Sequence, residues 1–515
     1  QLYGIEIEEF PARIAEVAMW LIDHQMNMLV SNEFGQYFVR LPLQKAANIV
    51  HGNALRMNWE AVVSKDSLSY ILGNPPFIGT AYQTDAQKND LINALTRLSS
   101  FGMLDYVCGW YVKAAELING TKIRAAFVST NSIAQGEQVG ILWGYLIKNL
   151  GMKIHFAHRT FKWSNEAKGK AAVHVVIIGF GQYDINEKRL YFYDHIAGDP
   201  ELTIVKNINP YLVSARDVIL DSISNPICLV PRMQSGSAAR DGGFLIFTDA
   251  EYQEFSKKHQ NIAHYFKRLI SGDDFINNII RWCLWLKDMD ISFISRLPEI
   301  KDRLQKCKDF RLKSTREGTK RMAEYPYLFA EERQPVGKFI LIPKVSSENR
   351  RYIPIAFLDE NYIITDKTFV VPKASFYNLG VLLSLMHMTW TKNTCGRLKS
   401  DISYSNTIVY NNFPWPESPT EKQKAQIEQA AQAVLDARTQ FPESSLADLY
   451  DPLTMPPVLL KAHQELDKAV DLAYRPQPFP SEAKRMEFLF ELYEKYTAGL
   501  FGEEKKPKKK KSAKA

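Results

Sequence analysis

Along the first part of the chain, short apolar runs alternate with longer segments in which apolar residues recur at helical spacing. Runs rich in β-branched and aromatic residues predict buried strands at 2–7, 48–51, 69–74, 123–130, 152–158 and 173–180. Helical spacing occurs at 10–27, 105–118 and 141–150, and the apolar stripe of the first helix is formed by Ile14, Val17, Ala18, Leu21 and Ile22. Strands separated by helices pair in parallel, so this part is predicted to form an open, doubly wound α/β sheet.

The pattern changes beyond residue 198. Residues 199–416 mix short strand-like runs with turn-rich stretches such as PRMQSGSAARDGG at 231–243. After Pro416 helical spacing returns at 421–441, 461–475 and 481–501, and His463 is expected on a helix surface. We therefore expect an α/β domain at 1–198, a mixed α/β domain at 199–416, a helical domain at 417–501 and a tail at 502–515.

The net charge of +7 adds little to this picture because most of it lies in the tail. Residues 503–515 hold seven lysines and two glutamates, which contribute +5 and leave the rest of the chain at about +2. A lysine-rich run of this kind cannot bury apolar surface, so we expect a disordered basic tail. A solvated tail, a phosphate-attracting arm and a nuclear-import signal are all compatible with it.

Composition excludes several classes of protein. The five cysteines have no CxxC pair, which argues against a disulfide framework and against a zinc site, and no other metal site is predicted. No apolar run has the roughly 18 residues needed to span a bilayer. The sequence also shows no glycine-rich Walker loop and no HExxH segment. A reducing cytosol fits this cysteine usage best.

The stretch YILGNPPFIG at 70–79 carries the first candidate chemistry. Proline cannot donate to a sheet ladder, so the strand must end at Asn74-Pro75-Pro76-Phe77, at the carboxyl edge where ligands bind. The side-chain oxygen of Asn74 and the carbonyl of Pro75 are adjacent acceptors that match the two hydrogens of an exocyclic amino group. Phe77 offers a face for stacking. A proline-rich turn with a packed phenylalanine accounts for the same residues equally well.

An acidic residue follows the first strand. Glu6, or else Glu8, is suited to accept hydrogen bonds from a ribose, as acids at strand ends do in nucleotide-binding α/β units. A solvated carboxylate near a helix N-terminus is the better explanation when Glu6 is considered alone. The glycine-rich turn that usually lies about 20 residues before such an acid is missing. We therefore expect an N-terminally truncated chain or one partner of a split enzyme.

The chain resembles the MmeI-type restriction–modification enzymes of types IIL and IIG over residues 1 to about 500. Asn-Pro-Pro-Phe after an apolar strand is the catalytic motif of adenine-N6 DNA methyltransferases. Further blocks that carry the resemblance are NALRMNW, IHFAHRTFKWSNEAKGKAAVHVVIIGF, RWCLWLKD, IPKVSSENRRYIPIAF, HMTWTKNTCGRLKSDISYSNTIVYNNFPWP and SLADLYDPLTMPP.

The resemblance implies that residues 1–198 form a class I methyltransferase sheet, incomplete at its N-terminus, which takes a methyl group from S-adenosylmethionine. Asn74 and Pro75 would hold the amino group of a flipped-out adenine, Pro76 would stiffen the loop and Phe77 would stack on the base. For the cofactor, the resemblance implies Glu6 at the ribose and Asn53 with Ala54 at the adenine. Phe161 and Trp163 would flank the flipped base, although packing against the sheet also explains them.

The resemblance further implies that residues 199–416 are a target-recognition domain for double-stranded DNA. Arg232, Arg397, Lys399 and Ser400 are the candidate DNA contacts, although an ordinary protein surface explains each of them singly. Because the nuclease and the glycine-rich loop of the family are missing, we expect no DNA cleavage and weak or no cofactor binding by this chain alone. An N-terminal fragment that supplies them is a candidate partner.

Three functions remain open at this point. The first is an adenine-specific DNA methyltransferase, or the larger part of one. The second is a DNA-binding remnant that has lost catalysis, or one part of a split methyltransferase. The third is a small-molecule or protein-glutamine methyltransferase, which shares the Asn-Pro-Pro-Phe type of motif, but the large recognition-like half argues against it.

Overall fold

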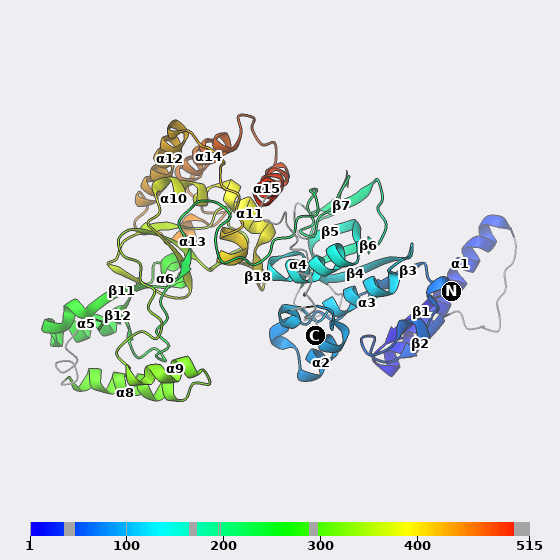
Figure 1. The fold of residues 1–515 in the computed structure, drawn as a ribbon, viewed down its shortest axis with the longest axis horizontal. Coiled ribbons are helices and arrows are strands. Elements are labelled where there is room, and N and C mark those ends of the chain that lie inside the picture. Colours follow the sequence, from blue (N-terminus) through cyan, green and yellow to red (C-terminus); the bar gives the residue numbers. More distant parts are fainter. Residues whose placement is uncertain are drawn as a thin grey trace, which may run out of the picture. The chain divides into compact units, whose positions relative to one another are not determined.

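The computed structural model describes residues 2–35, 47–98, 100–163, 173–193, 195, 197–287 and 297–498 (Figure 1). The chain divides into two compact units, residues 1–220 and residues 221–515. The predicted basic tail at 502–515 lies outside the described residues.

The first unit is built on a six-stranded sheet of order β3-β4-β6-β5-β7-β8. Its strands are β3 (Tyr70–Gly73), β4 (Arg124–Thr130), β5 (Lys153–Trp163), β6 (Val173–Gly181), β7 (Lys188–Phe192) and β8 (Glu201–Val205). The strands expected from the sequence are present. The expected parallel pairing is wrong for β6, which runs antiparallel to β4 and to β5. Residues 164–172 are too few for the crossover of a dozen or more residues that a parallel pair needs.

Helices α3 (Cys108–Ile118) and α4 (Gly136–Trp143) cover one face of this sheet, and α2 (Asp85–Ala94) precedes them. A π-helix at Gly144–Asn149 continues α4. The ring of Tyr111 packs 5.1 Å from Phe127 and 5.5 Å from Phe180. Trp143 adds an edge contact to Phe180. Aromatic packing therefore fixes α3 and α4 on the sheet.

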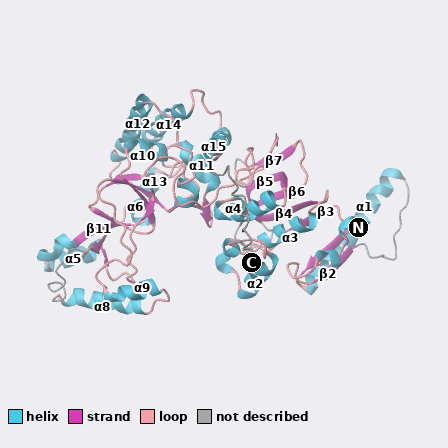
Figure 2. Cartoon of the chain, viewed as in Figure 1, coloured by secondary structure: helices cyan, strands magenta, loops and turns pink. Residues whose placement is uncertain are grey.

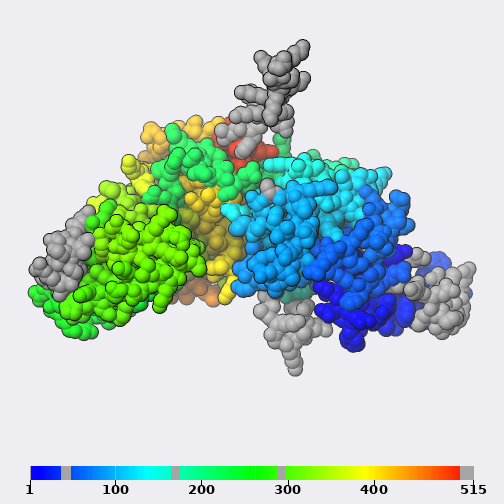
Figure 3. Space-filling view, turned by 60° about the horizontal axis from the view of Figure 1, so that its bottom comes forward, coloured from blue at the N-terminus to red at the C-terminus, as the bar shows by residue number. Residues whose placement is uncertain are grey.

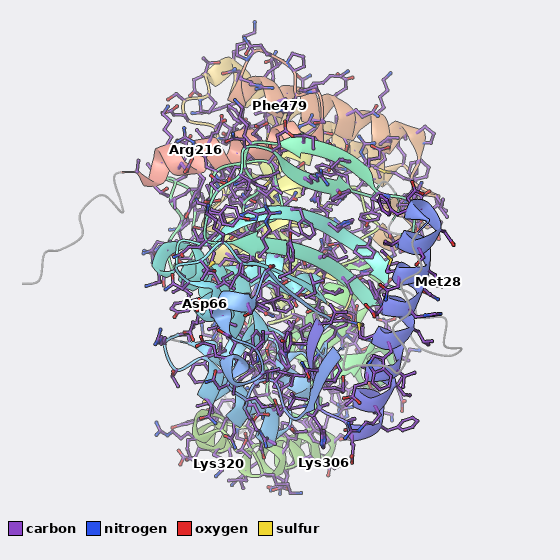
Figure 4. The ribbon with its side chains drawn as sticks, turned by 90° about the vertical axis from the view of Figure 1, so that its right-hand side faces the viewer. Met28, Asp66, Arg216, Lys306, Lys320 and Phe479 are labelled. Atoms are coloured by element: carbon purple, nitrogen blue, oxygen red, sulfur yellow. The ribbon has the colours of Figure 1, made fainter. Side chains whose placement is uncertain are left out.

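A separate two-stranded parallel sheet is formed by β1 (Leu2–Glu6) and β2 (Ala47–His51), with α1 (Glu9–Phe34) beside it. The predicted helix is confirmed, but its apolar stripe is not buried. Ile14 is 53% exposed, Val17 50% and Leu21 57%, whereas the buried residues of α1 are Ala12 and Ser31. In Figure 4, α1 runs along the outside of the first unit, where Met28 is labelled. None of the described elements of this unit covers the stripe.

The second unit begins as a mixed α/β structure, as expected, and its described strands form three sheets (Figure 2). Their orders are β10-β12-β11-β16, β15-β13-β17-β9 and β14-β19-β18. The strands are β9 (Gln234–Ser235), β10 (Ile246–Thr248), β11 (Phe266–Ile270), β12 (Arg281–Leu284), β13 (Phe339–Pro343), β14 (Val345–Ser346), β15 (Ala356–Leu358), β16 (Tyr362–Ile364), β17 (Thr368–Pro372), β18 (Gly396–Leu398) and β19 (Asp401–Ser403). The helices in this part are α5 (Asp249–Lys258), α6 (Gly272–Asn277), α8 (Pro298–Leu312) and α9 (Glu317–Arg321).

A buried arginine holds part of this mixed region together. Arg311, on α8, is fully buried in a region whose core includes Leu245, Phe266 and Ile300. Its guanidinium donates five hydrogen bonds of 2.6–3.0 Å to the carbonyls of Ala239, Arg240, Met322, Tyr325 and Leu328. One side chain thus joins three segments that are distant in sequence.

The second unit ends in helices, as the sequence predicts. They are α10 (Phe376–Leu383), α11 (Leu385–Thr394), α12 (Glu421–Thr439), α13 (Leu446–Leu449), α14 (Pro457–Tyr474) and α15 (Glu482–Thr497). Thr420 and Gln423 form a capping box at the start of α12, and Ile427, Ala431 and Val434 on its apolar face are fully buried.

His463 is fully buried, so its expected surface position is wrong. Its ring stacks 4.0 Å from Tyr352, whose hydroxyl donates to Asp467 at 2.6 Å. Burial raises the pKa of Asp467 to about 6, although the hydrogen bonds from Tyr352 and from the Leu385 amide oppose this. Folding therefore favours the protonated carboxyl.

The pKa of Asp467 is higher in the folded protein than its ordinary value of 3.8. The protonated carboxyl therefore adds stability to the fold below pH 3.8, and this stability is lost as pH rises through about 6. We expect the free energy of unfolding of the wild type, relative to Asp467→Asn, to fall by about 2–3 kcal/mol between pH 4 and pH 7. Urea denaturation of both proteins across this range measures the difference. A difference that stays constant with pH would contradict the assignment to Asp467.

Candidate active site

The carboxyl ends of β3, β4 and β5 lie at one edge of the six-stranded sheet. β3 and β4 are parallel, and β5 points the same way because β6 is antiparallel to both β4 and β5. This edge therefore carries the corner Asn74–Phe77 after β3 and the aromatic residues Phe161 and Trp163 at the end of β5. Ligands bind at such an edge in open α/β sheets.

The corner is only partly exposed. Asn74 and Pro76 are exposed, Pro75 is buried and Phe77 is half-buried. Within the described residues, neither the side-chain oxygen of Asn74 nor the Pro75 carbonyl accepts a hydrogen bond. The chain turns directly afterwards, where the Ile78 amide donates to the Pro76 carbonyl at 3.1 Å. The two neighbouring oxygens thus have no hydrogen-bond partner among the described residues, and the Asn74 oxygen belongs to an exposed side chain.

The aromatic pair at the end of β5 belongs to a small cluster. The Phe161 ring stacks on Tyr193 with centroids 5.0 Å apart and lies 6.1 Å from Trp163. Tyr193 also hydrogen-bonds to His158 at 2.8 Å. Packing therefore accounts for one face of Phe161, as the alternative explanation expects, while Phe161 and Trp163 both remain partly exposed.

The structure brings the corner and the aromatic pair to the same edge but not into contact. β4 and β6 lie between β3 and β5, which places the two strands about 14 Å apart at the usual strand spacing. Among the described residues, no ring contact joins Phe77 to Phe161. Any shared ligand must therefore extend across the ends of two strands.

Glu6 and Asn53 follow the neighbouring parallel strands β1 and β2, so they also share one edge. Glu6 is half-buried, and its carboxylate accepts a hydrogen bond from the Glu8 amide at 3.2 Å. The carbonyl of Ala54 accepts from the Trp59 indole at 2.9 Å. The Glu6 carboxylate thus retains acceptor sites for a further donor.

The side chain of Asn53 is already engaged within the chain. Its Oδ1 accepts from the Leu55 amide at 2.9 Å, and its Nδ2 donates to Asp90 at 3.0 Å. Asp90 also accepts from Arg56 at 2.6 Å and from the Tyr106 hydroxyl at 3.0 Å. Asn53 is therefore oriented by this cluster, with one amide hydrogen and one lone pair remaining.

The sequence identified neither Asp90 nor its partners Arg56 and Tyr106 in this cluster. Burial disfavours the ionised form of Asp90, but hydrogen bonds from Arg56, Tyr106 and Asn53 outweigh that effect and lower the pKa of its carboxyl. Burial and the bond to Asp90 raise the pKa of Tyr106 to about 12. The cluster thus holds a buried carboxylate, paired with an arginine, behind the predicted cofactor residue.

In the second unit, three candidate DNA contacts lie on the hairpin of β18 and β19. Arg397 donates to the carbonyls of Ser400 at 3.3 Å and Lys392 at 3.1 Å, so it supports the hairpin itself. Lys399 is exposed at the turn, with a left-handed φ of +58°. Arg232 is exposed just before β9. Lys399 and Arg232 are therefore presented to solvent, and Arg397 is partly committed to the fold.

The described residues show neither a metal site nor a membrane-spanning helix. They contain no group of three or more His, Cys, Asp or Glu side chains arranged to hold a metal ion. Their helices also include none with the length and apolar character needed to cross a membrane.

Comparison with known proteins identifies the family. Models of the MmeI DNA-methyltransferase domain, target recognition domain and C-terminal domain match residues 1–192, 214–417 and 419–501 in that order. The chain belongs to the MmeI family. The predicted resemblance and α/β fold class are thus confirmed, and the three domain matches together extend over both units.

Two relatives support the MmeI assignment. The structure of the type IIL restriction–modification enzyme MmeI in complex with DNA matches with a TM-score of 0.85 and 50% sequence identity, over 97% of this chain and 66% of that one. DNA methyltransferase A of Bacillus subtilis (strain 168) is 40% identical over 501 residues, which are 96% of this chain and 56% of the relative. The chain thus spans somewhat more than half of the relatives it matches.

Proposed function

We propose that this chain is the modification part of an MmeI-type restriction–modification enzyme and methylates N6 of adenine in double-stranded DNA, with S-adenosylmethionine as the methyl donor. One observation carries the proposal. The Asn74 side-chain oxygen and the Pro75 carbonyl are adjacent acceptors without a partner in the described chain, at the carboxyl edge of an MmeI-family methyltransferase domain.

Each residue of the corner has a separate task in this proposal. The two oxygens accept the two hydrogens of the adenine amino group, which orients the nitrogen lone pair. Phe77 stacks on the base, which is worth roughly 1–3 kcal/mol and offsets the few kcal/mol needed to flip it out. Pro75 and Pro76 restrict the backbone, so the acceptors are aligned before the base arrives. Phe161 and Trp163 would contact the far side of the flipped nucleotide.

The donor set at β1 and β2 fits the cofactor. Bound S-adenosylmethionine would supply a methyl group on a positively charged sulfur. Glu6 would accept from the ribose hydroxyls through its remaining lone pairs, and Asn53, oriented by Asp90, would meet the adenine end with Ala54 beside it. No side chain needs to act as a strong base, because positioning and exclusion of water suffice for this transfer.

A further polypeptide segment is part of the proposal, and we propose that it carries the glycine-rich cofactor loop. The apolar stripe of α1 is exposed, and α1 belongs to the dark blue part of the chain in Figure 3. Among the described strands, β3 lies at the edge of its sheet, with Leu72 78% exposed, and β1 pairs with β2 alone. Open strand edges and an apolar helix face together suit a strand–helix segment.

Cofactor titration tests this part. We expect isothermal titration of the chain alone with S-adenosylmethionine to show weak or no binding. Adding the part of the Bacillus subtilis relative outside its 501 matched residues should restore micromolar binding. Micromolar binding by the chain alone would show that the proposed segment is dispensable.

Transfer of a labelled methyl group separates the three candidate functions. Genomic DNA is incubated with the chain and the radiolabelled cofactor, with and without the supplied segment. Label in DNA supports the proposal. Sequence-specific DNA binding without label supports the DNA-binding remnant. Label in protein or in small molecules, with none in DNA, supports the third alternative.

Lys399→Ala is expected to weaken DNA binding by about fivefold to tenfold on all sequences and to reduce the salt slope by about one. The reason is that an exposed lysine at a hairpin turn suits a phosphate better than a base edge. Lys373→Ala is a matched control, because Lys373 is also exposed with a left-handed φ of +56°. Fluorescence anisotropy with several DNA duplexes measures whether the loss of affinity is the same on all sequences. A loss confined to one base position would mean that Lys399 reads a base.

A further inference from the structure

Asp105 links the loop after the corner to the end of the neighbouring strand. It is only 7% exposed and lies just before α3. Its Oδ1 accepts from the backbone amide of Thr80 at 3.3 Å. Its Oδ2 accepts from the hydroxyls of Thr130, at 3.3 Å, and Ser132. Thr80 lies three residues after Phe77, and Thr130 ends β4, so one carboxylate bridges the two loops at the carboxyl edge.

The backbone around Asp105 reinforces this bridge. The Tyr106 amide donates to the Ile78 carbonyl at 2.9 Å, and the Gln83 side chain donates to the Leu104 carbonyl at 3.0 Å. On the other side, the Asp105 amide donates to the Gln138 side chain, on α4, at 3.2 Å. Residues 104–106 are thus hydrogen-bonded to the loop at 78–83, and Asp105 also links this loop to the loop that follows β4.

These hydrogen bonds matter for the corner because few hydrogen bonds of the sheet reach it. Within the described part of the chain, β3 pairs only with β4, and the pairing ends at Gly73. Pro75 and Pro76 have no amide hydrogen with which to extend the ladder. Beyond Gly73, Pro75 is buried by packing, and the hydrogen bonds nearest the corner among the described residues are those of the segment that follows it, where Asp105 contributes the only carboxylate.

We propose that Asp105 is a positioning residue, which acts through Thr80 to fix the Asn74–Phe77 corner against the end of β4. The paired acceptors are then aligned before a base arrives. This role rests on the proposed methyl transfer, although Asp105 itself touches neither the base nor the cofactor. Since a misplacement of about 1 Å can cost about 100-fold in rate, loss of the bridge should act on turnover rather than on binding.

The test compares Asp105→Ala and Asp105→Asn with Asp217→Ala. Asp217 is a matched control in the same unit, since it also accepts two side-chain hydrogen bonds, from Lys153 and Asn207, but at the opposite end of β5. Each variant is assayed in the form in which the wild type transfers methyl groups, alone or with the supplied segment. Steady-state kinetics are combined with hydrogen–deuterium exchange of the peptide spanning 74–83.

We expect Asp105→Ala to lower kcat about 30- to 100-fold, with KM for DNA and for the cofactor within about threefold. Exchange at 78–83 should rise in Asp105→Ala and stay unchanged in Asp217→Ala. Asp105→Asn should recover most of kcat, because its amide can still pair with the Thr80 amide and with both hydroxyls. This rescue, with the split between kcat and KM, is a result that a merely structural role would not give.

Other outcomes overturn the role of Asp105 in distinguishable ways. An unchanged kcat in Asp105→Ala, or a parallel loss of kcat, affinity and stability, would refute positioning while leaving the methyl transfer intact. If the wild type transfers no methyl group even with the segment, the proposed function fails instead. Hydrogen–deuterium exchange still tests whether Asp105 holds the loop at 78–83. Equal exchange of this loop in Asp105→Ala and in the wild type would refute that contact.

Discussion

Asn74→Ala is expected to lower the rate of methyl transfer by about 100- to 1,000-fold, the usual cost of losing one preorganised hydrogen-bonding partner of a reacting group. The substitution removes one of the two adjacent acceptors and leaves the Pro75 carbonyl alone. Because Asn74 is exposed and accepts no hydrogen bond in the described chain, the fold should lose no more than about 0.5 kcal/mol. Affinity for duplex DNA should stay within about threefold.

Single-turnover methylation with saturating DNA measures this effect. Asn89→Ala is a suitable control, since Asn89 is also exposed in the first unit but lies on α2, away from the corner. Asn74→Asp retains oxygens at the same place and separates loss of the acceptor from loss of the amide nitrogen. Retention of more than a third of the wild-type rate by Asn74→Ala would refute the role of this side chain.

The second large effect concerns stability. Arg311→Met should destabilise the second unit by about 3–5 kcal/mol, because it leaves five carbonyl oxygens without their donors in a buried site. Arg311→Lys should be intermediate, because an ammonium group has three donors where the guanidinium has five. Urea denaturation followed by circular dichroism gives the free energies.

Arg316→Met provides the control for this series, since Arg316 is an exposed arginine that lies between α8 and α9. It should change the free energy of unfolding by no more than about 0.5 kcal/mol. Equal losses in Arg311→Met and Arg316→Met would mean that the buried hydrogen bonds of Arg311 add no net stability.

Local rules were sufficient for the corner and for most elements. The end of β3 follows from the chemistry of Pro75 and Pro76, which act on their own backbone and need no distant partner. The helix at 421–441 was predictable for the same reason, since Thr420 and Gln423 cap it locally and Ile427 marks its buried face. The antiparallel direction of β6 does not follow from the predicted strands, because they leave residues 159–172 between them, whereas β5 extends to Trp163 and shortens the connection.

The residues that the sequence did not reveal depend on distant partners. Asp90 meets Asn53 across 37 positions, and the carbonyls bound by Arg311 come from backbone up to 72 positions away. Asp105 carries a weak signal, as an acid directly before a helix, but nothing in the sequence indicates that Thr80 and Thr130 converge on it. The exposed stripe of α1 shows the opposite case, in which correct helical spacing did not predict burial.

The identity of the product nucleoside tests the central claim most directly, because the paired oxygens of Asn74 and Pro75 are proposed to receive the amino group of adenine. DNA methylated by the chain with its supplied segment is digested to nucleosides and analysed by mass spectrometry, with isotopically labelled methyl from S-adenosylmethionine. The account predicts the label in N6-methyl-2′-deoxyadenosine, and its loss with Asn74→Ala. Label in a methylated cytosine, or in adenine with Asn74→Ala as active as the wild type, would contradict it.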